Sequence, residues 1–232
     1  MNTEAEAIQF AGSTLDEALA GIDVLSHPVY VREGLDIFHG HVRGALGAGE
    51  QLLADRAELA QKADLIYPAG AARLAREAQA EAERNGKASL HAARTSIDVL
   101  RRAALLGAQP VLDKEREGMA RDEFSLLVGE GSPAQLMARV AEIASSGSRD
   151  SVSVLNSSFG AALLKHRGLE GQDLSDTLDS AKRIVVESAA TQPERYTEAE
   201  LSSAQLYNSL GELDAAVAAT SFALGHLGVS HA

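Results

Sequence analysis

The sequence has 232 residues, a formal net charge of −12 at pH 7 and 45% hydrophobic residues, but only 4% aromatic residues and no cysteine or tryptophan. Without cysteine there are no disulfide bonds and no thiolate metal or redox sites, and the acidic balance argues against direct nucleic-acid binding, which needs a basic face. Because strong helix formers abound while β-branched and aromatic residues are scarce, the composition predicts an all-α protein.

The N-terminal 25 residues carry one apolar stripe. Its members recur at alternating steps of three and four residues: Ile8, Ala11, Leu15, Ala18, Ile22 and Leu25. This spacing predicts an amphipathic helix that ends before Pro28. The repeat resembles a coiled-coil seam. We therefore expect Ile8, Leu15 and Ile22 to pack on a neighbouring helix, within the chain or across a subunit boundary, and we treat them as a candidate interaction surface.

The next part of the sequence predicts five short helices. They are expected over residues 35–46, 52–66, 70–85, 90–104 and 111–128. The glycines at 44, 47 and 49 each weaken a helix by about 1 kcal/mol relative to alanine and predict a break. Asn85 and Gly86 predict a helix end. The 70–85 helix is rich in Ala, Arg and Glu and has few large apolar side chains to bury.

The clearest internal boundary lies at residues 129–132, where two glycines release the chain and Ser132 with Pro133 restarts a helix. We predict an N-terminal helical lobe over residues 1–129 and an acidic C-terminal lobe over residues 132–232. Helices of the second lobe are expected over residues 133–145, 150–167, 173–190, 198–209 and 213–227, the last two forming an antiparallel α-hairpin. The chain is thus predicted to be a bundle of ten or eleven short-to-medium amphipathic helices.

The C-terminal end of the sequence is strongly acidic. Residues 168–232 contain ten Asp and Glu against three Lys and Arg. Glu198, Glu200, Glu212 and Asp214 fall around the ends and turn of the expected hairpin. We treat them as a candidate surface for a basic partner or for a basic patch on a sister subunit. The alternative is that these carboxylates only keep a surface solvated.

A metal site is the sharpest enzymatic alternative. Asp36 and His39 lie three residues apart, a spacing that places two ligands on one helix face, and His41 follows. A bundle metal site needs a second carboxylate–histidine pair at this spacing, and no other histidine in the sequence has one. We therefore predict solvated or hydrogen-bonded side chains here, with no metal, cofactor or catalytic residue. An enzyme that uses Asp36 and His39 on a metal is the third-ranked hypothesis.

No run of 18 apolar residues occurs and the N-terminal stretch is acidic, which predicts neither a membrane span nor an export signal. We expect synthesis in the cytoplasm and no membrane partner. Apolar stripes without a catalytic constellation predict a non-enzymatic structural or assembly protein that acts through helix-mediated protein contacts. The alternative is a cytosolic helical adaptor or regulator that binds one protein partner.

The stretch over residues 66–84, Ile-Tyr-Pro-Ala-Gly-Ala-Ala-Arg-Leu-Ala-Arg-Glu-Ala-Gln-Ala-Glu-Ala-Glu-Arg, leads into the 90–104 helix. This part of the sequence resembles the small helical structural and head–tail assembly proteins of tailed bacteriophages. The resemblance implies a homo-oligomeric virion component that acts in many copies. Its partners would be copies of itself or other assembly subunits, and it would be incorporated into a virion after synthesis.

Overall fold

The computed structural model describes residues 3–62, 65–111 and 113–229, and every regular element in these ranges is helical. In chain order the elements are α1 (Thr3–Ala20), η1 (Val24–Ser26), α2 (Val29–Gln61), α3 (Pro68–Gly107), α4 (Glu117–Val128), α5 (Pro133–Ser146), α6 (Arg149–Leu155), α7 (Ser158–His166), α8 (Gly171–Thr191), η2 (Pro193–Arg195) and α9 (Glu198–His226). The all-α class is confirmed. Within the described ranges no helix is both long enough and apolar enough to cross a lipid bilayer.

The helices are fewer and longer than expected, because three predicted breaks do not occur. α2 continues through its glycine cluster, α3 passes Asn85 and Gly86, and α9 runs through Gly211, so the predicted C-terminal α-hairpin is wrong. Close packing surrounds Gly49 in α2 and Gly86 in α3, whereas a Cβ atom on Gly211 of α9 would have no neighbour within 4 Å. A Cβ atom on Gly49 would lie 2.9 Å from Ile8 Cδ1, so this glycine allows α1 to approach α2 closely.

The chain divides into two compact units. Unit 1 comprises residues 1–101 with 209–232, and unit 2 comprises residues 102–208. The lobes predicted from the sequence, 1–129 and 132–232, differ from these units. The reason is that residues 129–132 connect α4 to α5, and both helices contribute to one apolar core in unit 2. The predicted helix restart at Ser132 is confirmed, since its hydroxyl caps α5 by accepting a hydrogen bond from the Gln135 amide.

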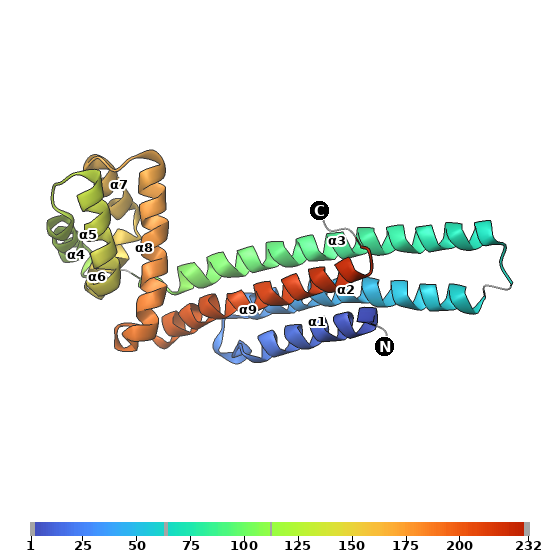
Figure 1. Cartoon of the computed structure of the whole chain (residues 1–232). Coiled ribbons are helices and arrows are strands. Elements are labelled where there is room, and N and C mark those ends of the chain that lie inside the picture. Colours follow the sequence, from blue (N-terminus) through green and yellow to red (C-terminus); the bar gives the residue numbers. More distant parts are fainter. Residues whose placement is uncertain (1–2, 63–64, 112, 230–232) are drawn as a thin grey trace. The chain divides into compact units, whose positions relative to one another are not determined.

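Unit 1 is built from α1, α2, the first part of α3 and the last part of α9 (Figure 1). α1 is antiparallel to α2, since Asp16 pairs with Arg43 while the earlier residue Ile8 lies against Gly49. α2 is in turn antiparallel to α3, because position 34 lies against Leu100 and position 56 bonds to Gln79. The largest fully buried side chains of this unit are Leu15, Phe38, Leu52, Ile97, Leu100 and Leu210.

Unit 2 contains α4 to α8 with the adjoining ends of α3 and α9. Its main core is formed by Phe124, Val128, Leu136, Val140, Ile143, Val152, Val154, Leu155, Leu164, Leu169 and Val185, with three alanines between them. The expected helix over residues 150–167 is two helices, α6 and α7, because Ser157 caps a new helix by accepting a hydrogen bond from the Gly160 amide.

Candidate functional site

The four-helix part of unit 1 is closed at one end by Arg56. One guanidinium nitrogen of Arg56 donates to Glu4 Oε1 at 3.1 Å, and the other donates to Gln79 Oε1 at 3.0 Å and to the Leu227 carbonyl oxygen at 2.8 Å. These bonds join α1, α2, α3 and the end of α9. Beyond them α2 and α3 continue as a pair (Figure 1). We call described residues 53–62 and 65–81, which include Arg56 and Gln79 themselves, the distal hairpin.

The distal hairpin buries none of its side chains. Leu52 and Ala82, which flank it, are 1% and 4% exposed, whereas every described residue from 53 to 81 is partly or fully exposed. Leu65 and Tyr67 are 85% and 87% exposed. Burial of apolar surface is the main favourable term in helix packing. The distal hairpin therefore contributes little to the stability of unit 1, although its helices are regular.

Local geometry explains why the turn presents Leu65 and Tyr67 outward. α2 ends at Gln61, and Pro68 is the first residue of α3, where its missing N–H costs no helical hydrogen bond. The Tyr67 carbonyl oxygen accepts hydrogen bonds from the amides of Gly70 at 2.8 Å and Ala71 at 3.0 Å. The Tyr67 carbonyl is thus satisfied by the first turn of α3, and the Leu65 and Tyr67 side chains are left in solvent.

A groove of about 340 Å³ runs between the two helices of the distal hairpin. It is lined by apolar and acidic side chains with one lysine: Asp55, Glu58, Leu59, Lys62, Ile66, Leu74, Glu77, Ala78 and Glu81. Lys62 pairs with Glu58, and this hydrogen bond and charge lower the pKa of the Glu58 carboxyl. The groove therefore presents apolar side chains beside four carboxylates and one lysine.

The metal candidate is not assembled in the structure. Within the described ranges, no three histidine or carboxylate side chains are placed to hold one ion. His39 Nε2 instead accepts a hydrogen bond from Arg43 Nε at 3.3 Å. The geometry therefore gives the enzymatic hypothesis no support.

The apolar residues predicted as an interaction surface lie in the core of unit 1. Ile8, Leu15 and Ile22 are 5%, 0% and 6% exposed. Of the two alternatives for the stripe, packing within the chain is the one observed. Leu25, expected on the same stripe, is 85% exposed, because α1 ends at Ala20 and the chain turns before reaching it.

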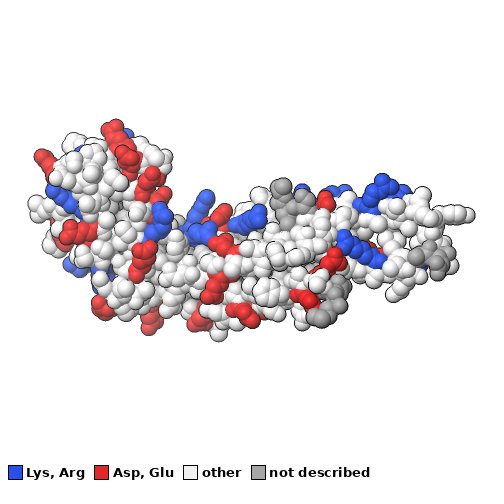
Figure 2. All heavy atoms as spheres, viewed as in Figure 1, with Lys and Arg blue, Asp and Glu red and all other residues white. Residues whose placement is uncertain are grey.

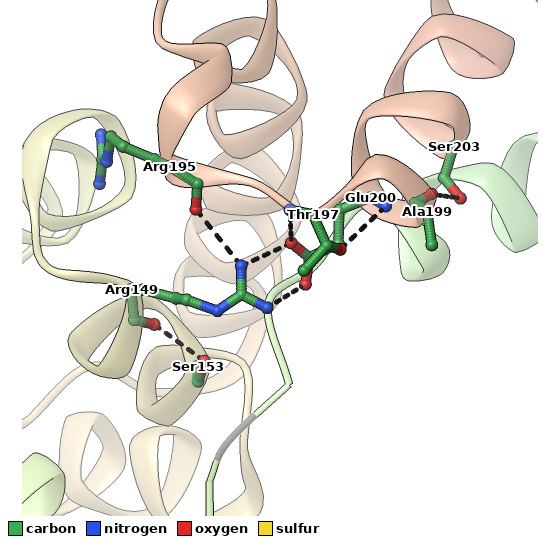
Figure 3. A network of polar contacts seen from close by, with 7 residues as sticks. All are labelled: Arg149, Ser153, Arg195, Thr197, Ala199, Glu200 and Ser203. Carbon is green, nitrogen blue, oxygen red and sulfur yellow. Dashed lines mark hydrogen bonds and ion pairs between the residues drawn. The ribbon is translucent and has the colours of Figure 1, made fainter.

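The predicted acidic residues do not share one environment. Glu200 is buried and binds Arg149 through two hydrogen bonds of 2.6 Å, while it also caps α9 by accepting from the Thr197 amide (Figure 3). Glu198 and Glu212 are exposed. Asp214 pairs with Arg101 at 2.5 Å. Because α9 is unbroken, no turn gathers these residues, and Glu200 has a structural role within unit 2.

Comparisons of the chain with protein-family models, curated proteins and solved structures gave no match. The candidate site therefore rests on its geometry. Sequence reasoning did not single out the distal hairpin, although it contained one usable signal. The 70–85 stretch has helical composition with few large apolar residues, and such a helix cannot bury a full face in its own unit.

Proposed function

We propose that this protein is a structural or assembly protein that acts through helix-mediated protein contacts, with the distal hairpin as a docking element. The observation that supports the proposal is the regular helix pair whose described residues bury no side chain. Ordering a residue costs about 1–2 kcal/mol of conformational entropy. A partner that covered the distal hairpin would supply the apolar burial that unit 1 does not.

The side chains at the turn fit this role. Leu65 and Tyr67 are large, apolar and almost fully exposed. Burying one such side chain contributes about 1.5–3 kcal/mol, and tyrosine is enriched at the energetic centres of protein interfaces. The adjoining groove offers further apolar contact at Leu59, Ile66 and Leu74.

The proposal is tested by replacing Tyr67 with a photo-cross-linking amino acid in cells that express the protein. A protein adduct is expected from position 67. Tyr30, which is 58% exposed in the same unit, is the matched control position and should give much less adduct. If position 67 yields no adduct, or no more than position 30, the distal hairpin is not a docking element.

A second experiment separates docking from folding. The variant Leu65→Ser/Tyr67→Ser should keep the melting temperature of the parent protein, because neither side chain is buried. It should nevertheless lose the cross-linked partner when the photoreactive residue stands at position 74. Leu25→Ser/Tyr30→Ser changes the same residue types at exposed positions elsewhere in unit 1 and should keep the partner.

The identity of the adduct distinguishes the specific forms of this function. Adducts with copies of the chain or with several assembly subunits would support an assembly protein, and incorporation into a virion stays a prediction from the sequence resemblance. A single different protein would favour the adaptor or regulator.

A further inference from the structure

Unit 1 carries a stripe of unpaired basic residues on one face of α3. Its members are Arg76, Arg84, Lys87 and Arg94, all of them exposed. At 100° per residue, these positions fall within about 80° of one another around the helix. None of them forms an ion pair with a described residue, whereas Arg43, Arg56 and Arg101 of the same unit are all paired. We call these four residues the α3 basic stripe.

The outer face of α1 carries the opposite charge. Glu6 and Glu17 are exposed and form no ion pair within the described part of the chain. Phe10 lies between them on the same face and is 67% exposed. This face is opposite the buried stripe of α1, and no residue of unit 1 that the structure describes buries these three side chains. We call these three residues the α1 acidic stripe.

The two stripes match in spacing. Glu6 and Glu17 are eleven residues apart, and so are Arg76 and Lys87. Eleven residues are about three turns and rise about 16 Å, so each pair points to one side of its helix. The match extends to the side chain between the charges. Phe10 follows Glu6 by four residues, and the small, exposed Ala80 follows Arg76 by four residues.

We propose that the α3 basic stripe of one copy binds the α1 acidic stripe of a second copy, with Phe10 lying over Ala80. Figure 2 shows basic side chains along the α3 edge of unit 1 and acidic ones along the edge where α1 lies. Since α1 and α3 run in the same direction, parallel pairing makes all copies point the same way (Figure 1). Such a head-to-tail contact repeats and generates a ring or an open row.

The charges of the two stripes determine which surfaces meet more than how tightly they bind. Exposed ion pairs contribute only about 0–1 kcal/mol each. The charges therefore select the partner and speed encounter, while the Phe10 contact adds apolar burial. A chain of net charge −12 repels its copies in most orientations, whereas the four basic residues of the α3 basic stripe outnumber the one carboxylate among them, Glu83, and attract the α1 acidic stripe. Arg76 and Ala80 belong to the distal hairpin, but neither lines its groove. The variant Leu65→Ser/Tyr67→Ser leaves both stripes intact, so the two proposals can fail independently.

Charge reversal tests the pairing. The basic-face variant is Arg76→Glu/Lys87→Glu, and the acidic-face variant is Glu6→Lys/Glu17→Lys. Self-association of the whole chain is measured by sedimentation at about 50 mM and about 500 mM NaCl. At these concentrations the Debye length is longer and shorter, respectively, than the physiological value of about 8 Å. At the lower salt concentration each variant should self-associate at least tenfold more weakly than the parent. An equimolar mixture of the two, and a single chain with all four changes, should regain association.

Matched controls keep the net charge change but leave the stripes intact. They are Lys114→Glu/Lys165→Glu and Glu33→Lys/Asp36→Lys, all at exposed positions. Both should associate like the parent, and so should Leu65→Ser/Tyr67→Ser in the distal hairpin. The proposal is overturned if the parent stays monomeric at low salt, if the controls weaken association equally, or if combining the reversals restores nothing. Loss of association in the distal-hairpin variant alone would assign self-association to that site instead.

Discussion

Burial decides what the acidic residue Glu200 does. Its carboxylate is buried and paired with the partly exposed guanidinium of Arg149, although it was expected from the sequence to lie on a charged surface. Glu200→Gln leaves the arginine without its charged partner and should lower the free energy of unfolding by about 2 kcal/mol. Urea unfolding measures this loss. Glu198→Gln, two residues away and exposed, is the control; equal effects of the two substitutions would argue against a structural role.

His27 makes the stability of the chain depend on pH. The residue is 6% exposed, and burial lowers the pKa of its imidazole below the usual 6.5, more than the Asp23 carboxylate raises it. The folded state thus binds a proton less readily than the unfolded state. This contribution to stability is complete above pH 6.5 and is lost as the pH falls below that value.

Replacing the imidazole removes this dependence. In His27→Gln the decrease in unfolding free energy between about pH 7.5 and about pH 5.5 should be smaller than in the parent chain. Chemical denaturation at several pH values gives the slope. His166→Gln removes an exposed histidine and should leave the slope as it is. An unchanged slope in His27→Gln would mean that other groups cause the acid sensitivity.

At the scale of elements, the glycines of α2 differ in what surrounds them. A Cβ atom at Gly47 would have no neighbouring atom within 4 Å. A Cβ atom at Gly49 would lie 2.9–3.0 Å from the side chains of Ile8, Leu224 and Leu227. Gly47→Ala should therefore raise the unfolding free energy by about 0.5–1 kcal/mol through helix propensity alone. Gly49→Ala should gain less or be destabilising. Thermal unfolding compares the two, and an equal gain would show that α2 is not closely approached.

The sequence predicted amphipathic faces better than helix ends. The helical spacing of Ile8, Leu15 and Ile22 predicted that they share one face, and all three are buried, because a buried helix face needs apolar residues at that spacing. A helix end depends on a balance of about 1 kcal/mol per glycine against packing from distant helices, such as Leu224 on Gly49. The sequence around a glycine does not show which distant helices will pack against it, so it cannot predict whether the helix ends there. The distal hairpin was missed for the same reason, since which helices end early is a property of the whole unit.

At the scale of the whole molecule, unit 2 is continuous in sequence and unit 1 is not. The fragment 102–208 contains a complete core and should give a cooperative, helical unfolding transition by circular dichroism. The fragment 1–101 lacks Leu213 and Leu224, which are buried in unit 1, and should be only partly helical without a sharp transition. A cooperative transition in the shorter N-terminal fragment would show that α9 is dispensable for that core.

The interrupted unit also sets an order of events during protein synthesis. Residues 1–101 leave the ribosome first, yet their core cannot close until α9 is made more than a hundred residues later. At about 5–20 residues per second this delay lasts roughly 5–20 s, because all of unit 2 is synthesised before the part of α9 that completes unit 1. The apolar faces of α1, α2 and α3 stay open throughout that interval. The nascent chain is thus most exposed to chaperones, and to premature association with neighbouring nascent chains, at the unit that begins first and finishes last.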